Sequence, residues 1–184
     1  MKQLAIALIQ YNQDYDDRFP IAKYWAAEIY PYVKSTGVYH CPEDKSVATE
    51  TAFPVSYAIN RNVDREADTK FTDLSVTVLA CNYTSVSGNV THPNDIASSS
   101  RTCGLDIGAS VWGDAPLGYK ATARTIHDPF VMFLASDRHA KLLRPDQVSG
   151  GANVATSTSP MGAKPDAAAG TKALGIKTLT FSLR

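Results

Sequence analysis

The sequence predicts an α+β roll, in which N-terminal helices pack on a mostly antiparallel β-sheet. Two observations carry this prediction: apolar side chains recur at helical spacing up to residue 36, and short alternating runs between turn residues follow from residue 37. The length of 184 residues is that of one domain. We therefore expect a single domain over 1–184, with a helical part (1–36) and a β-rich head (37–184).

The first helix is predicted at the start of the chain. Four large side chains recur at steps of four, three and four and so share one helix face: Leu4, Leu8, Tyr11 and Tyr15. A run of aspartates and then Pro20 end this pattern. We expect this face to cover the sheet.

A second helix is predicted over about residues 21–33. Trp25, Ile29 and Val33 are four residues apart, and Pro31 lies near the end of the segment. Two helices in a row therefore precede the β-rich part.

Six segments of the remaining chain are predicted to be strands: 38–40, 55–59, 74–79, 131–135, 139–143 and 176–183. The alternation is clearest in 74–79, and 131–135 is apolar throughout, as in a buried strand. A tight turn at Asp137 and Arg138 is expected to pair 131–135 with 139–143. Long loops are predicted over 81–104 and 149–175, where small and polar residues prevail.

Charge and hydropathy limit the classes of function. Eighteen basic and eighteen acidic residues give a formal net charge of zero, without the basic excess that nucleic-acid binding proteins normally carry. No run approaches 18 consecutive apolar residues, so no membrane span is predicted in this sequence. Near-zero net charge leaves little repulsion between copies, which favours self-association.

The sequence predicts no catalytic residue, cofactor or metal site. It lacks the common motifs of serine hydrolases, zinc peptidases, and nucleotide- or dinucleotide-binding proteins. The alternating acids Asp64, Glu66 and Asp68 resemble a calcium loop, but Thr69 takes the place of its obligatory glycine. A solvated loop is the favoured interpretation.

Two sets of residues are candidates for structural links. Cys81 and Cys103 bracket a polar stretch and can form a disulfide in an exported protein, the alternative being three unlinked thiols. His127, Asp137 and His139 can meet if the strands around them pair. Contacts of this kind usually hold structure, so we predict a structural role.

Several segments, taken in this order, resemble one family of bacterial proteins. The matching segments are MKQLAIAL at 1–8, YNQDYDDRFP at 11–20, YPYVKST at 30–36, VYHCPED at 38–44 and SYAIN at 56–60. Towards the end of the chain, His127 is followed by nine residues and then Asp137, and HAKLLRP follows at 139–145. The family is that of pilin-like proteins, similar to the pseudopilins of type II secretion, which carry a prepilin-type N-terminal segment and a C-terminal H-X9-DG domain.

The resemblance implies a pilin-like roll and assigns roles to particular residues. The family motif comprises His127, Asp137, Arg138 and His139, and Arg138 stands where the family has glycine. Because glycine allows a positive φ, the turn is expected to differ here. Cys41 belongs to the matched CP segment and is therefore expected to stay outside the disulfide.

The resemblance also implies a function. We predict a secreted structural subunit that polymerises with itself into an extracellular or cell-surface filament, without enzymatic activity. Membrane contact is expected only through an upstream apolar stalk, which this sequence does not contain. Assembly contacts are predicted for the helix face and the terminal strand: Leu4, Leu8, Tyr11, Tyr15, Leu179 and Phe181. Deleting residues 172–184 is expected to abolish polymers.

Two other functions are kept as alternatives. The first is a soluble, pseudopilin-like head that binds a secreted substrate or a surface glycan through Trp112, Tyr119 and their neighbours. The second is an enzyme that uses His127, Asp137 and His139. Electron microscopy of the purified protein separates the filament from both.

Overall fold

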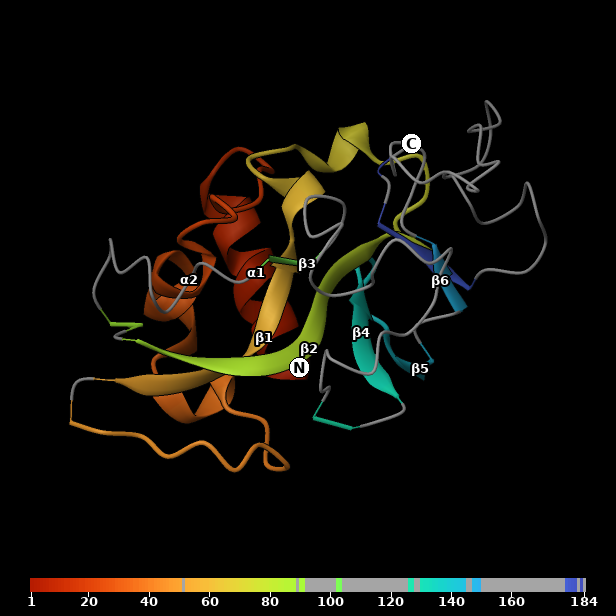
Figure 1. Ribbon diagram of the computed structural model, residues 1–184. Coiled ribbons are helices and arrows are strands. Elements are labelled where there is room, and N and C mark those ends of the chain that lie inside the picture. The colour runs from red at the N-terminus through yellow and green to blue at the C-terminus, as the bar shows by residue number, and fades with distance from the viewer. Residues whose placement is uncertain are drawn as a thin grey trace.

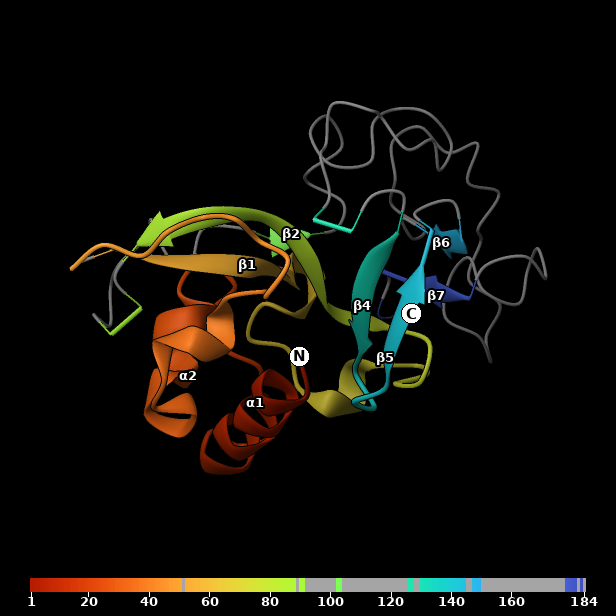
Figure 2. The same cartoon turned by 90° about the horizontal axis from the view of Figure 1, so that it is seen from below.

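The computed structural model of the protein has two N-terminal helices beside a twisted β-sheet (Figure 1). The description covers residues 1–50, 52–88, 90–91, 102–103, 126–127, 130–144, 147–149, 178–181 and 183. Within these residues the fold is α+β, as predicted. Figure 2 shows α1 and α2 on the same side of β1 and β2.

The first helix, α1 (Lys2–Asp14), buries the face that its apolar spacing indicates. Leu4, Leu8 and Tyr11 are buried against the sheet. Tyr15 caps the helix and stays 52% exposed, so it lies outside this buried face. The chain then takes left-handed backbone angles at two aspartates, which reverse its direction.

The second helix, α2 (Trp25–Val33), is also confirmed. Trp25 and Ile29 are almost completely buried, four residues apart on one face. Pro31 lies inside the last turn, and Lys34 ends the helix in a left-handed conformation.

The main sheet has five strands in the order β3-β1-β2-β4-β5. Their bounds are β1 Phe53–Asn60, β2 Val78–Gly88, β3 Thr102–Cys103, β4 Val131–Ala135 and β5 Ala140–Leu143. All neighbours are antiparallel except β1 and β3, which are parallel. The predicted β4–β5 hairpin is confirmed, with Val131 opposite Leu143. A small second sheet pairs β6 (Val148–Ser149) in parallel with β7 (Leu179–Thr180).

Two strand predictions, 38–40 and 74–79, are wrong in whole or in part, and a third, 176–183, is confirmed only for Leu179–Thr180. The strand expected at 74–79 begins only at Val78 and continues through the start of the predicted 81–104 loop. Residues 74–76 form a turn, because the Asp73 side chain accepts hydrogen bonds from the backbone N–H and hydroxyl of Ser75 (2.9 and 2.6 Å).

The segment expected as a strand at 38–40 lies in a 3-10 helix, η1 (Thr36–Tyr39), and its end. Tyr39 is fully buried, and its hydroxyl donates to the carbonyl of Ala26 in α2 at 2.8 Å. At the C-terminal end, the strand among the described residues is only Leu179–Thr180. Tertiary contacts therefore override the local alternation in both places.

The two faces of the sheet belong to two apolar clusters. One face packs under the helices and contributes Val55, Tyr57 and Ile59 from β1. The opposite face contributes Ala58, Cys81 and Phe133 and is covered by the C-terminal segment, where Leu179 and Phe181 are buried. Successive residues of β1 thus point to opposite faces, so both sides of the sheet are core.

Within the described part of the chain, no helix combines the length and apolar character needed to cross a bilayer.

Candidate functional site

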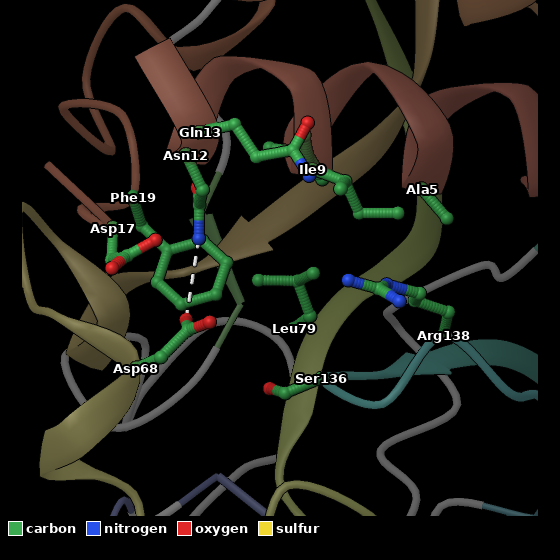
Figure 3. A pocket seen from close by; sticks show the side chains of 11 residues that line it. Ala5, Ile9, Asn12, Gln13, Asp17, Phe19, Asp68, Leu79, Ser136 and Arg138 are labelled. Atoms are coloured by element: carbon green, nitrogen blue, oxygen red, sulfur yellow. Dashed lines mark hydrogen bonds between the residues drawn. The ribbon is translucent and has the colours of Figure 1, made fainter. Parts of the chain in front are cut away.

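A cavity of about 130 Å³ lies where α1 faces the β4–β5 turn (Figure 3). Four further elements close it: the turn after α1, the 3-10 helix η3 (Asp68–Lys70), β2 and the end of β4. Its lining has an apolar wall and several polar side chains: Ala5, Leu8, Ile9, Asn12, Gln13, Asp17, Phe19, Asp68, Leu79, Ser136 and Arg138. This combination of apolar wall and few polar groups is typical of small-molecule sites.

One end of the cavity is acidic. The amide nitrogen of Asn12 donates to Oδ1 of Asp68 at 3.2 Å, and Asp17 lies on the same side (Figure 3). Burial, and then the charge of Asp17, raise the pKa of the Asp68 carboxyl, and Arg138 acts in the opposite direction. Two neighbouring carboxylates therefore make this end of the cavity favourable for a positively charged group.

Asn12 adds an unsatisfied acceptor to this acidic end. The residue is only 7% exposed, and within the described residues its Oδ1 has no hydrogen-bond partner. A buried carbonyl oxygen without a partner costs about 1–3 kcal/mol, and this oxygen has almost no surface accessible from the cavity.

The backbone fixes the two acidic residues next to each other. Asp17 has a left-handed φ of 56°, and its carbonyl accepts from the N–H of Asp68 at 3.2 Å. The N–H of Phe19 donates to the carbonyl of Glu66 at 3.0 Å. The turn after α1 is thus joined to the segment before η3, although the two are about fifty residues apart in sequence.

Arg138 forms the other end of the cavity. Its side chain extends from the β4–β5 turn towards the apolar wall, on the side away from Asp68 (Figure 3). Its φ is 81°, the positive value that the family glycine would adopt freely. Within the described residues the guanidinium makes no hydrogen bond and no ion pair closer than 4 Å.

The expected contact between His127 and Asp137 is wrong. The two residues lie at opposite ends of β4, since His127 precedes the strand and Asp137 follows it. Asp137 instead binds its neighbour: its Oδ1 accepts from the N–H of His139 at 3.1 Å, and its Oδ2 is 2.7 Å from Nδ1 of His139. The group of His127, Asp137 and His139 proposed for an enzyme is therefore not formed.

His127 contacts Cys41, which sequence reasoning did not predict. Nε2 of His127 is 3.3 Å from the Cys41 sulfur, across 86 residues of sequence. Cys41 is 4% exposed, and a thiol this deeply buried is usually unreactive. No local pattern in the sequence joins these two residues, although both lie in segments that carry the pilin-like resemblance.

A chain of hydrogen bonds holds the Cys41 segment against β1. The N–H of Cys41 donates to the Ser56 hydroxyl at 2.9 Å, and that hydroxyl donates to a carboxylate oxygen of Asp44 at 2.6 Å. Burial foremost, followed by the proximity of Cys41, raises the pKa of Tyr57 to about 12. The matched CP and SY segments thus meet in the folded core.

The predicted disulfide between Cys81 and Cys103 is also wrong. Cys81 lies in β2 opposite Ala58 and is a buried thiol, whereas Cys103 lies in β3 opposite Asn60. Since β1 separates the two strands, their Cα atoms are about 10 Å apart from strand spacing alone, beyond the reach of a disulfide.

The predicted assembly residues, with one exception, are inside the subunit. Leu4, Leu8 and Tyr11 pack under the sheet, and Leu179 and Phe181 are at most 2% exposed on its other face.

Both backbone edges of β7 are also paired within the subunit. One edge pairs with β6, and the other forms a bridge between Thr180 and Thr77. The described part of this strand, Leu179–Thr180, is therefore engaged within the subunit, and the contact with a neighbouring copy stays a prediction. Tyr15 remains exposed and stacks on Tyr11 with ring centroids 4.2 Å apart.

Some predictions fall outside the described residues. These are the proposed binding residues Trp112 and Tyr119, and the predicted loop over 149–175 apart from Ser149.

Comparison of the chain with protein-family models, curated proteins and solved structures finds no match. The pilin-like resemblance therefore stays a prediction from the sequence motifs.

Proposed function

We propose that this chain is a structural, secreted subunit of a pilin-like extracellular filament and that its partner is a second copy of itself. The support is the arrangement of α1 on the sheet together with the character of its outer face. The proposal places the filament contact on α1, because the terminal strand is engaged within the subunit.

The outward face of α1 is uncharged along most of its length. Four exposed residues at spacings of three and four form this face: Gln3, Ile6, Gln10 and Gln13. Ile6 is 55% exposed at its centre. Charged residues are depleted in the centres of protein interfaces, and here they occur only towards the ends of the helix, at Lys2 and Asp14.

The net charge of zero is the second support. Copies of a neutral protein approach one another without long-range repulsion. A contact between this helix face and a different surface of the next copy would be heterologous, and such contacts propagate into fibres when they do not close into a ring.

Sedimentation velocity and negative-stain electron microscopy of the purified chain test this proposal. We expect concentration-dependent assemblies that Ile6→Lys abolishes, because a lysine at the centre of an interface costs its desolvation. Val47→Lys is the matched control, since Val47 is 80% exposed on a distant loop, and it is expected to leave the assemblies intact.

A wild-type chain that stays monomeric at the highest attainable concentration contradicts the proposal. A monomer that is retained on a polysaccharide column would favour the alternative function, a soluble head that binds a surface glycan. Retention on a column carrying secreted proteins of the same cell would favour the substrate-binding form of that alternative.

A further inference from the structure

The cavity between α1 and the β4–β5 turn contains two charged ends that do not neutralise each other. Asp17 and Asp68 lie at one end and the Arg138 guanidinium at the other (Figure 3). Within the described residues, neither carboxylate has a cationic side chain within 4 Å, and the guanidinium acts on Asp68 only at longer range, without a hydrogen bond or a close ion pair. Opposite charges thus face one open space without closing an ion pair across it.

The polar groups at the acidic end are those that bind an ammonium group. Two carboxylates accept charge-assisted hydrogen bonds from an amine. The Asn12 amide nitrogen donates to Oδ1 of Asp68 at 3.2 Å and so holds that carboxylate in place at the same end. The two carboxylates together have four acceptor oxygens, enough for the three donors of an ammonium.

The opposite end suits a carboxylate. A guanidinium presents two parallel N–H donors to a carboxylate. Ser136 also lines the cavity, but its hydroxyl donates its proton to the Thr77 carbonyl at 3.2 Å, so the carboxylate contact is assigned to Arg138 alone. Between the two ends, Ile9 and Leu79 form an apolar wall that fits a short hydrocarbon chain.

A divalent cation fits the same cavity less well. Calcium prefers six to eight oxygen ligands, and the described residues contain no group of three or more metal-ligating side chains. A metal at the carboxylates would also share the cavity with the positive charge of Arg138, which it would repel. The cavity volume of about 130 Å³ exceeds what a single ion requires and is suited to a small organic molecule.

We propose that this cavity binds a small zwitterion of amino-acid size, with its ammonium group at Asp17 and Asp68 and its carboxylate at Arg138. The site requires Arg138 and is therefore specific to a chain with an arginine where the resembled family has glycine. Its test is separate from that of the proposed filament contact, since Ile6 does not line the cavity and Gln13 is the one residue of that helix face that does.

Isothermal titration calorimetry with a graded series of ligands tests the proposal. The series is glycine, β-alanine, γ-aminobutyrate and δ-aminovalerate, in which the two charges move progressively apart. Butylamine and butyrate are the matched ligands with one charge each, and calcium chloride is the metal probe. We expect one member of the series to bind at least about tenfold more tightly than both singly charged ligands, because only a zwitterion engages both ends.

Variants assign the binding to the two ends. Asp68→Asn and Arg138→Gln are each expected to weaken the best zwitterion at least about tenfold. The matched controls are Asp16→Asn, in the same turn as Asp17, and Lys141→Gln, on the same hairpin as Arg138; neither residue lines the cavity. Both controls are expected to bind as the wild type does. Because Arg138 lies on an exposed turn, Arg138→Gln gives a result even if Asp68→Asn fails to fold.

Three results would overturn the proposal. Equal affinity for butylamine and the best zwitterion would show that Arg138 takes no part, and saturable binding of calcium without any zwitterion would make the cavity a metal site. The absence of heat and of ligand-induced thermal stabilisation for the whole series would show that it binds none of them.

Discussion

The two ends of β4 differ in burial although one motif spans both. At the first end, His127 contacts the buried Cys41. At the other, the Asp137 carboxylate binds His139, whose side chain is 75% exposed. The five residues of β4 extend about 17 Å, so a histidine and an aspartate spaced this way cannot meet across it.

This difference shows that the motif has two separate structural roles. The histidine end ties the strand to the Cys41 segment in the core, and the aspartate end shapes the turn that carries Arg138 into the cavity. Stability is expected to depend on the first end, whereas ligand binding depends on the second. Four predictions test this division, in order of decreasing effect.

The largest loss of stability is expected for Ser56→Ala, at a residue bonded to Cys41. Ser56 is fully buried, and its hydroxyl serves both the N–H of Cys41 and the Asp44 carboxylate. Removing it leaves the N–H of Cys41 without its acceptor and takes one of its hydrogen bonds from the Asp44 carboxylate. This is expected to lower the free energy of unfolding by about 2 kcal/mol in urea titrations followed by circular dichroism. Ser46→Ala is the matched control, with an expected change below about 0.5 kcal/mol. Similar losses for both would contradict the prediction.

His127→Ala is expected to lower the free energy of unfolding by about 1–2 kcal/mol, because it removes the contact with Cys41. His139→Ala at the exposed end is expected to cost about 0.5 kcal/mol or less. The same urea titrations measure both. A loss at His139 equal to that at His127 would remove the distinction between the two ends.

Arg138→Gly is expected to stabilise the protein by about 0.5–1 kcal/mol. Glycine takes the φ of 81° without strain, and the arginine side chain loses no hydrogen bond among the described residues. Arg138→Ala removes the same side chain but keeps the strain, so its thermal midpoint is expected to stay close to that of the wild type. A higher midpoint for the alanine variant would place the effect in the side chain and not in the backbone.

The smallest effect concerns pH. The pKa of Asp68 is raised in the folded state, so the protonated carboxyl stabilises the fold. This stabilisation is complete at a pH below the ordinary pKa of 3.8 and is lost as the pH rises through the folded-state pKa. Asp68→Asn lacks this titration. The stability of the variant relative to the wild type is therefore expected to increase from about pH 3 to pH 7, measured by urea unfolding at each pH. A relative stability that falls over this range would show that the pKa is lowered.

The sequence by itself determined the elements whose signals are local. Leu4, Leu8 and Tyr11 on one helix face, and Trp25 and Ile29 on the next, follow from helical spacing, because a helix must bury its apolar side. The β4–β5 hairpin followed in the same way from a buried run, a short turn and a second run. Arg138 was recognised as a departure from the family pattern.

Only the tertiary structure decided which residues face each other. Alternation in 74–79 and 176–183 did not reveal that an aspartate would turn the first segment, or that Leu179 and Phe181 of the second would be buried on the far face of the sheet. The pairing of Cys41 with His127, and the cavity of Asn12, Asp17, Asp68 and Arg138, join residues distant in sequence. The periodicity of a segment indicates which of its faces is apolar. What packs against that face depends on the fold of the whole chain.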